Sequence, residues 1–443
     1  MTDITFLPHN EIWKIQQSKF VEMMSLVSQY HSAYIQKYAN SQIDLKDADL
    51  SMLDNFPNTE KSDLAANFEN YKLNLPVDYG EPIWDIAYTS GSTSLPIPIY
   101  QTSRDFRGIL LAQRRMAEIR GLTSSDRILN LFPLTQYPHG AWTRANHAGA
   151  TVGSYVACGM SGTLDEEFGA TRSLSEIVKM IENLQPTVFW GVPTYIKKVL
   201  DALILGGVRV PSLRMIAVSG EVCTSDMKSG LIDYSKLIGA EVHVSNSLGA
   251  SELQCGLVEC ADGFGFHNPA PELFYFSTLD ESGKQVADGD FGSLAVTHLD
   301  RRGTFLIKYL LGDEVQLTQD KCSNCGRAGG RIIAHKGRAG TLLKIRGQLI
   351  DRNALERIVR DFEGVSDYMI RVRKQVSSDA LSEDVLDIQI ARNSHENFKQ
   401  FELDLVAEVK QKVNLTPKIQ DVSLDELKIE NISIKTTRFK DER

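Results

Sequence analysis

The sequence lacks the features of a secreted or membrane-spanning chain. Its first residues, Met-Thr-Asp-Ile-Thr-Phe, hold neither the basic stretch nor the apolar core of a secretory signal. No uninterrupted apolar run approaches the ~20 residues that cross a bilayer. We therefore expect a cytoplasmic protein that has no membrane among its partners.

An excess of positive charge is lacking too. The 443 residues contain 48 Lys and Arg against 57 Asp and Glu, a formal net charge of −9. This balance argues against a general nucleic-acid binder, so a site for an anionic ligand has to concentrate positive charge locally. Internal repeats and low-complexity segments are absent, and a chain of this length predicts two or three domains.

Cysteine is scarce, and six residues in a cytoplasmic chain predict thiols or metal ligands rather than disulfides. Cys322 and Cys325 form a C-x₂-C knuckle followed by Gly326, which is the pattern of half a zinc site. A redox-active pair or plain buried thiols are the alternatives. Gly326 argues against the redox pair, because such pairs usually open a helix.

The other half of a zinc site could come from Cys260 and His267, which a Gly-rich segment joins. Cys255 is a substitute ligand. A closed site of three cysteines and one histidine is structural and pins two loops together.

What is present between residues 125 and 250 is an alternation of short apolar runs with amphipathic stretches. This pattern predicts an α/β fold, with mostly parallel sheets flanked by helices. In such sheets the functional loops follow the carboxyl ends of the strands. Ser219-Gly220-Glu221 and Ser245–Glu252 directly follow predicted strands, so we expect site residues in both segments. The predicted strands are Ile128–Phe132, Thr187–Val192, Arg214–Val218 and Glu241–Val244, and the helices are Leu174–Leu184 and Tyr195–Leu205.

The two ends of the chain have other patterns. Residues 11–38 are rich in helix formers and carry an aromatic stripe, which predicts a helix that packs against a core or serves a homodimer. After the Gly-rich segment Gly337–Gly340, a small α+β unit is predicted, so that the domains are 1–338 and 339–443. Its predicted strands are 342–346, 368–374 and 385–391, and its helices 353–362 and 396–413.

The stretch Tyr88–Pro96 is dominated by Ser, Thr and Gly and lies between apolar segments. Hydroxyls and bare backbone N–H groups in such a loop suit phosphate oxygens, and glycine permits close approach. A solvated Ser/Thr turn is the alternative interpretation. Further motifs follow in order along the chain: Ser247–Glu252, Lys308–Asp313, Gly337-Arg338 leading into Lys344–Gly347, and Lys435.

With these motifs in this order, the chain resembles the adenylate-forming superfamily of acyl-CoA synthetases, luciferases and peptide-synthetase adenylation domains, in particular its phenylacetate–CoA ligase branch. The resemblance implies that the loop Thr89, Ser90, Gly91, Ser92 and Thr93 holds the ATP phosphates. It implies that Glu252 ligates Mg²⁺ and that Ser251 reaches the α-phosphate. The remaining implied nucleotide-binding residues are Ser219, Gly220, Glu221, Leu248, Gly249, Asp313 on the ribose, and Arg338 on ribose or phosphate.

The same resemblance makes Lys435 the catalytic lysine of a mobile C-terminal domain, with Lys440 as a nearby rival, and Gly340 part of the hinge. An ammonium at the α-phosphate neutralises charge that develops during carboxylate attack. Ser94, Leu248, Gly340 and Ile434 depart from the family pattern. A degenerate nucleotide-binding protein is therefore the alternative to an enzyme.

An acyl pocket is expected in the region of Tyr137–His147, and its aromatic and polar side chains suit an aryl or arylacetic acid. The candidates are Tyr137, His139, Trp142, Asn146, His147 and Trp190. The implied reaction is ATP- and Mg²⁺-dependent activation of a carboxylic acid to an acyl-adenylate, followed by transfer to CoA. A carrier-protein thiol or an amine is the alternative acceptor. Some members of the branch carry a structural zinc on a Cys/His set at this place, which here is Cys260, His267, Cys322 and Cys325.

Overall fold

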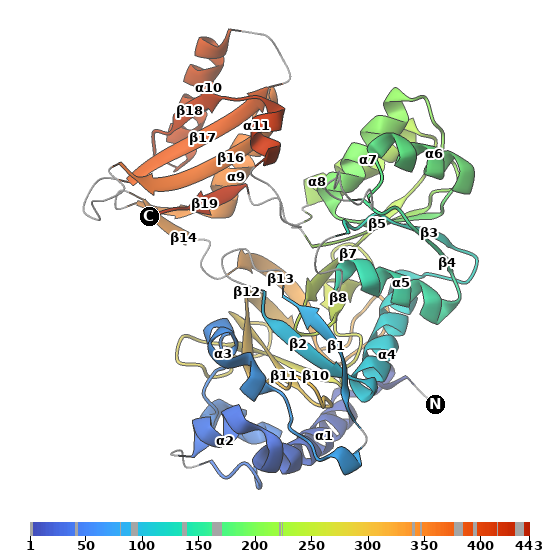
Figure 1. The fold of residues 1–443 in the computed structure, drawn as a ribbon, viewed down its shortest axis with the longest axis vertical. Helices are drawn as coiled ribbons and strands as arrows, with labels where there is room; N and C mark the ends of the chain where they lie inside the picture. Colours follow the sequence, from blue (N-terminus) through green and yellow to red (C-terminus); the bar gives the residue numbers. More distant parts are fainter. Residues whose placement is uncertain are drawn as a thin grey trace. The chain divides into compact units, whose positions relative to one another are not determined.

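The computed structural model describes residues 3–39, 43–79, 81–89, 96–134, 140–161, 171–220, 223, 225–338, 342–345, 348–375, 384–392, 397–413, 415–429 and 438–443. The chain divides into two compact units, Met1–Lys336 and Gly337–Arg443 (Figure 1). Within the described ranges, no helix has both the length and the apolar composition that crossing a bilayer requires.

The first unit begins with a helical layer. The predicted helix over 11–38 is two helices, α1 (His9–Tyr30) and α2 (Ser32–Tyr38). The break falls at His31, whose backbone is extended and whose Nδ1 accepts the Tyr34 N–H at 3.3 Å, so that its side chain caps α2. Short 3₁₀ turns and one helix follow: η2 (Leu50–Asn55), α3 (Lys61–Asn67), η3 (Phe68–Tyr71) and η4 (Val77–Tyr79), with η1 (Ile4–Phe6) before α1.

The aromatic stripe of this layer packs inside the first unit, as one of the two sequence interpretations predicts. Phe20 and Tyr34 are fully buried, and Trp13 contacts the ring of Tyr275 edge-on. The Gln16 amide donates to the carbonyl of Pro271 at 2.9 Å. Helix α1 is therefore part of the core of the first unit.

An 11-stranded sheet forms the centre of the first unit, and its strand order is β10-β11-β12-β13-β9-β8-β7-β6-β5-β3-β4. The strands from β3 to β7 pair in parallel, which confirms the α/β class. Their bounds are β3 (Arg127–Asn130), β4 (Tyr155–Cys158), β5 (Val188–Gly191), β6 (Met215–Ser219) and β7 (His243–Ala250).

Helices cover both faces of this parallel part (Figure 1). Neighbouring residues of a strand point to opposite faces, and Phe189 packs in the cluster that includes α6, α7 and α8, while Trp190 packs in the cluster that includes α4 and α5. The helices are α4 (Ser103–Arg120), α5 (Ala141–Val152), α6 (Leu174–Leu184), α7 (Pro193–Leu205) and α8 (Ser225–Leu237).

The rest of the large sheet includes several antiparallel pairs that sequence patterning does not indicate. Strand β8 (Cys255–Glu259) pairs antiparallel with β7 and with β9 (Phe266–His267). The remaining strands are β10 (Phe274–Leu279), β11 (Phe291–His298), β12 (Tyr309–Thr318) and β13 (Arg331–Arg338). A separate antiparallel hairpin, β1 (Ile83–Tyr88) and β2 (Pro98–Thr102), flanks the Ser/Thr/Gly stretch.

One predicted loop is wrong. Ser245–Glu252 was expected to follow a strand that ends at Val244, but β7 continues to Ala250. Its polar residues are held in the sheet because β6 pairs with β7 up to Ser247 and β8 pairs with it up to Ala250. Only the last residues of the motif form a turn.

The second unit is the small α+β unit that the sequence predicts. Its four-stranded sheet has the order β18-β17-β16-β19. Ile370 and Ile388 pack with α9 and α10 on one face, whereas Met369 and Ala391 pack with α11 on the other. The elements are β14 (Leu342–Ile345), β15 (Gln348–Asp351), α9 (Arg352–Arg360), β16 (Val365–Lys374), β17 (Asp384–Arg392), α10 (Phe398–Val413), β18 (Lys418–Asp421), α11 (Leu424–Ile429) and β19 (Phe439–Asp441).

Candidate functional site

A tight turn joins β7 to β8 and carries the predicted magnesium ligand. Glu252 is half-buried there, and the Tyr309 hydroxyl donates to its Oε1 at 2.8 Å. Tyr309 begins β12, which β8, β9 and β13 separate from β7 in the strand order. The hydrogen bond shows that the sheet curls enough to bring the start of β12 to this turn. Glu252 is thereby joined to the strand that carries Asp313.

The backbone of this turn is held by buried side chains. The Arg301 guanidinium donates to the carbonyl of Leu253 at 2.7 Å, and the Gln113 amide donates to the carbonyl of Gln254 at 3.1 Å. Gln254 has a φ of 58°, a left-handed conformation that costs free energy in a residue with a side chain. Surrounding contacts therefore fix the geometry next to Glu252.

The predicted nucleotide-binding residues of β6 and β7 lie side by side. Ser219 pairs with Ser247 across the two strands, and the Ser219 hydroxyl donates to the Ser247 carbonyl at 3.0 Å. A Cβ at Gly249 would lie 3.5 Å from Ser219 Oγ, so the two positions are neighbours. Gly220 directly follows β6 and has a φ of 89°, a conformation that glycine adopts readily. Leu248 packs against the main core.

Asp313 lies in β12, four residues after Tyr309, at a distance of about 13 Å along an extended strand. It is buried, and His335 Nε2 lies 3.0 Å from its Oδ1. His335 comes from β13 and was not predicted as a site residue. One hydrogen bond from His335 orients the carboxylate and leaves it capacity to accept others, since a carboxylate offers about four lone pairs.

The predicted phosphate loop is described only at its base. Thr89 is buried and pairs with Ile97, which donates its N–H to Thr89 Oγ1 at 3.1 Å. Arg338 ends β13, and its side chain lies outside the described residues. The other predicted residues that lie outside the described ranges are Ser90, Gly91, Ser92, Thr93, Tyr137, His139, Glu221, Gly340 and Lys435.

The described acyl-pocket candidates on α5 meet the end of β3. Asn130 donates to the Trp142 carbonyl at 2.8 Å and to Asn146 Oδ1 at 3.0 Å. Trp190 belongs to the same buried cluster as Trp142, and the Arg120 guanidinium lies 4.4 Å from the Trp190 ring centroid. Trp190 and Asn130 are buried in the core where α4 and α5 cover the sheet, whereas Trp142 and Asn146 are half-buried at its margin.

The four predicted zinc ligands come together in space. The ligand atoms of Cys260, His267, Cys322 and Cys325 all lie within 4.8 Å of one another. His267 Nε2 is 3.2 Å from Cys260 Sγ and 3.6 Å from Cys325 Sγ, and Cys260 Sγ is 3.9 Å from Cys322 Sγ. Around a tetrahedral zinc with Zn–S bonds of about 2.3 Å, neighbouring ligand atoms lie about 3.5–3.8 Å apart. The donor set therefore fits zinc in number, type and spacing.

The surroundings of the cluster favour the ligand forms of His267 and Cys322, whereas burial raises the pKa of the Cys260 thiol to about 11. Burial lowers the pKa of His267 to about 4, which keeps the imidazole neutral. Burial acts to raise the pKa of Cys322, but hydrogen bonds from the backbone N–H groups of Cys325 and Asn324 outweigh it and lower the pKa. A neutral histidine and a thiolate are the forms that bind zinc.

The alternatives for these cysteines fit less well. Cys255 is fully buried in β8, lies outside the cluster, and has a pKa that burial raises to about 12. Cys322 and Cys325 lie in a turn, not at the start of a helix, and Gly326 completes it with a φ of 74°. The Gly326 N–H donates to the Cys322 carbonyl at 2.9 Å, so the knuckle is a closed loop.

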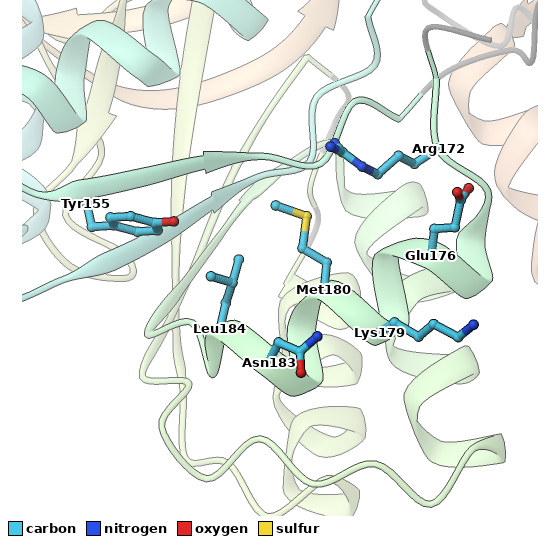
Figure 2. Close-up of a pocket in the computed structure, with 7 residues that line it drawn as sticks. All are labelled: Tyr155, Arg172, Glu176, Lys179, Met180, Asn183 and Leu184. Carbon is cyan, nitrogen blue, oxygen red and sulfur yellow. The ribbon is translucent and has the colours of Figure 1, made fainter.

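A cavity of about 450 Å³ lies elsewhere, against edge strand β4 and helix α6 (Figure 2). Tyr155 comes from the strand, and Glu176, Met180 and Leu184 come from the helix. The cavity shares no residue with the predicted site. We therefore do not assign it to the chemistry described here.

The sequence is similar to those of known AMP-binding enzymes. The family model described as AMP-binding enzyme matches residues 35–294, more than half of the chain. A phenylacetate–coenzyme A ligase of Thermus thermophilus is 23% identical over 383 residues, which cover 85% of this chain and 82% of that protein.

Solved structures of 2-hydroxyisobutyryl-CoA ligase share the fold. One, in the postadenylation state with 2-HIB-AMP, has a TM-score of 0.74 at 18% identity and covers 94% of this chain and 87% of that chain. Another, with 2-HIB-AMP and CoA in the thioesterification state, has a TM-score of 0.64 at 17% identity and covers 95% and 88%.

Proposed function

The chain belongs to the AMP-binding enzyme family, and from that membership we propose that it activates a carboxylic acid with ATP and transfers the acyl group to the thiol of CoA. The named activity of the Thermus thermophilus relative and the ligands named for the two ligase structures support this proposal. A carrier-protein thiol or an amine is the alternative acceptor of the acyl group, and the test below distinguishes these acceptors from CoA.

One observation of this structure carries the proposal: the hydrogen bond between Tyr309 and Glu252. It joins two motifs that lie 57 residues apart in the sequence. Glu252 would bind the metal and phosphates of a nucleotide, and Asp313 would bind its ribose. The hydrogen bond connects the turn that holds Glu252 to β12, the strand that holds Asp313. Ser219 and Gly249 lie at adjacent strand ends, which is where α/β sheets bind ligands.

The proposed chemistry has two steps. An oxygen of the substrate carboxylate attacks the α-phosphorus of ATP, and the bond to pyrophosphate breaks as pyrophosphate leaves. The CoA sulfur then attacks the acyl carbon, AMP leaves with the electron pair of the acyl–oxygen bond, and the thiol proton passes to solvent. Positioning and electrostatic stabilisation suffice for such steps, so no side chain has to form a covalent intermediate.

In this proposal residues 339–443 form a lid that brings Lys435 to the α-phosphate for the first step. Gly340 would permit the backbone rotation that an alternation between the two steps requires. Both residues lie outside the described ranges, so these roles rest on the resemblance of their motifs.

Two metals belong to the proposal. Glu252 offers a half-buried carboxylate, the hard oxygen ligand that Mg²⁺ prefers, and bound Mg²⁺ would neutralise phosphate charge. Cys260, His267, Cys322 and Cys325 would hold a structural zinc. That site would tie the segment after β8 to the β12–β13 connection, beside strands that carry the nucleotide residues.

The acid that we propose is of the aryl or arylacetic type. Trp142 and the His147 ring, which contacts Phe106 edge-on with centroids 5.1 Å apart, supply aromatic surface on α5 and α4. Asn146 supplies a polar group on the same helix. The named substrate of the phenylacetate–coenzyme A ligase relative agrees with this class.

The test is to incubate the protein with ATP, Mg²⁺ and hydroxylamine over panels of aryl, arylacetic, amino and fatty acids. Pyrophosphate release with hydroxamate formation is the expected result for aryl or arylacetic acids, and replacing hydroxylamine by CoA should then give a thioester. A hydroxamate without a CoA thioester would point to a carrier protein or an amine as acceptor. Folded protein that binds ATP but turns over no acid would identify a degenerate nucleotide-binding protein.

Cys325→Ser is expected to abolish stoichiometric zinc binding and to lower Tm by several degrees, because a structural site loses its tetrahedral closure. Metal analysis of the purified protein and thermal unfolding measure the two effects. Cys158→Ser is the matched control, since Cys158 is half-buried in β4 and lies outside the cluster. Wild-type protein that contains no zinc and unfolds identically with and without a chelator would contradict the assignment.

His335→Ala is expected to raise the KM for ATP roughly tenfold and to leave kcat nearly unchanged. A hydrogen bond to a charged group contributes about 1.5 kcal/mol or more, and 1.4 kcal/mol corresponds to tenfold. Lys336→Ala is the control, because Lys336 follows directly in β13 and forms an exposed ion pair with Glu314. An unchanged KM for ATP in His335→Ala would show that His335 does not orient a ribose-binding carboxylate.

A further inference from the structure

A buried arginine on helix α5 connects the proposed acid site on that helix with the Glu252 turn and with strand β2. Arg144 is only 5% exposed, and burial lowers its pKa to about 10, so it stays charged at neutral pH. Its hydrogen-bond partners within the described ranges are the side chains of Gln254, Gln101 and His147, and the charge of Asp85 acts on it favourably. A buried charge whose hydrogen bonds go to uncharged side chains is costly unless its geometry is well defined.

The first branch of this arrangement reaches the Glu252 turn. Arg144 Nε and Nη2 both donate to Gln254 Oε1, at 3.1 and 2.6 Å. The Gln254 amide in turn donates to the Ser251 carbonyl at 2.5 Å. Because the left-handed backbone of Gln254 needs support from its surroundings, the guanidinium fixes the amide, and the amide fixes the turn that presents Glu252.

The second branch reaches an acyl-pocket candidate. Arg144 Nη1 lies 3.0 Å from Nδ1 of His147, one helical turn further along α5. A guanidinium can only donate, so Nδ1 accepts, and the proton of the neutral imidazole is on Nε2. Arg144 therefore sets both the tautomer and the orientation of the His147 ring, which packs edge-on against Phe106.

The third branch reaches the hairpin that flanks the phosphate loop. Arg144 Nη2 donates to Gln101 Oε1 at 3.2 Å. Gln101 is fully buried in β2, the strand that follows the loop. One guanidinium thus contacts β2, helix α5 and, through Gln254, the turn after β7. Planar Arg can donate in several fixed directions at once, whereas the single ammonium of Lys cannot reproduce that fork.

We propose that Arg144 is a positioning residue that couples acid binding on α5 to metal binding at the Glu252 turn. The inference rests on the proposed adenylation function. In it, Arg144 makes the acid site and the Mg²⁺ site depend on each other. A ring of the acid that packs against His147 would thereby act on the geometry of the turn that holds Mg²⁺. Arg144 and Gln254 transmit this effect and do not themselves touch the reacting atoms.

The test uses ATP–pyrophosphate exchange with titrations of acid and of Mg²⁺. Arg144→Lys keeps the charge but loses the fork, and it is expected to raise the KM for the acid and the half-saturating Mg²⁺ concentration together, each about tenfold. His147→Ala is expected to raise only the KM for the acid. Gln254→Asn, which tolerates the left-handed backbone, is expected to raise only the half-saturating Mg²⁺ concentration.

A matched control separates positioning from general stability. Arg115→Lys changes an arginine of α4 that is similarly enclosed, with 12% of its side chain exposed, and that pairs with Glu272 and Asp3. It is expected to change neither constant. Thermal unfolding of each variant measures the folded fraction, and Gln254→Asn and His147→Ala keep the test decisive if Arg144→Lys unfolds.

Three results distinguish the possibilities. Joint shifts in Arg144→Lys with separate shifts in the other two variants support the coupling. The coupling would be falsified if the wild-type enzyme were active and Arg144→Lys only lowered the folded fraction. In that case the KM for the acid and the half-saturating Mg²⁺ concentration would both be unchanged. A wild-type protein that shows no exchange with any acid instead overturns the proposed function itself, and no variant is then needed.

Discussion

Replacing Lys435 by alanine is expected to lower acyl-adenylate formation by a factor of about 100–1,000, the loss typical of removing one group that stabilises transition-state charge. Its ammonium would neutralise the charge that builds up on the α-phosphate as the carboxylate attacks. Pyrophosphate exchange measures this step. Thioester formation from supplied acyl-adenylate does not include the attack on phosphorus, so it should proceed at nearly the wild-type rate.

Lys440→Ala is the matched control for this prediction. Lys440 lies in β19, where it pairs in register with Arg371 of β16, and this places it in the sheet of the second unit. We expect its loss to leave adenylation unchanged. Collapse of adenylation in Lys440→Ala but not in Lys435→Ala would exchange the two roles, and equal loss of both half-reactions in Lys435→Ala would contradict a step-specific role.

Glu252→Gln is expected to have the second large effect, a loss of about a hundredfold in kcat/KM for ATP together with a much higher Mg²⁺ requirement. The substitution preserves size and a hydrogen-bonding oxygen but removes the charge that a hard cation prefers. Initial rates of pyrophosphate release, measured over a range of Mg²⁺ concentrations at fixed ATP, report both effects.

Tyr309→Phe separates the carboxylate from its orientation. The variant removes only the hydroxyl that donates to Glu252 Oε1, and loss of such a charge-assisted bond is expected to reduce kcat/KM roughly tenfold. If Glu252→Gln showed the wild-type Mg²⁺ dependence, the carboxylate would not be a metal ligand, and the bond to Tyr309 would be purely structural.

Elements with a strong periodic pattern could be predicted from the sequence. Helix α6 has the predicted bounds, because its apolar residues recur at helical spacing and Ser173 and Glu176 form a capping box at its start. The short strands β15, β18 and β19 and helix α11 were not predicted. Each is held by its pairing or packing with a neighbouring element, and a run of only a few residues carries little periodic signal of its own.

Some residues of the candidate site could likewise be predicted from the sequence, and others could not. The clustering of Cys260, His267, Cys322 and Cys325 could be predicted, because a knuckle has a fixed local spacing and few residue types bind zinc. His335 and Arg144 could not, since their roles arise from contacts with Asp313 and Gln254, 22 and 110 residues away. Gln254 follows the Glu252 motif by two positions, yet only its left-handed backbone and burial reveal that it supports the turn.

The helices at the start of the chain have a practical consequence for protein production. The match to the family model begins at residue 35, which invites an expression plasmid that starts there. His31 Nε2 lies 3.2 Å from the Phe305 carbonyl, and the Tyr34 hydroxyl accepts the Ile307 N–H at 2.6 Å. Such a truncation would strip these partners from buried backbone groups and uncover the core against which α1 packs. Recombinant protein begun at that boundary should accumulate in inclusion bodies, and supplying residues 1–34 as a separate peptide should restore part of it to the supernatant.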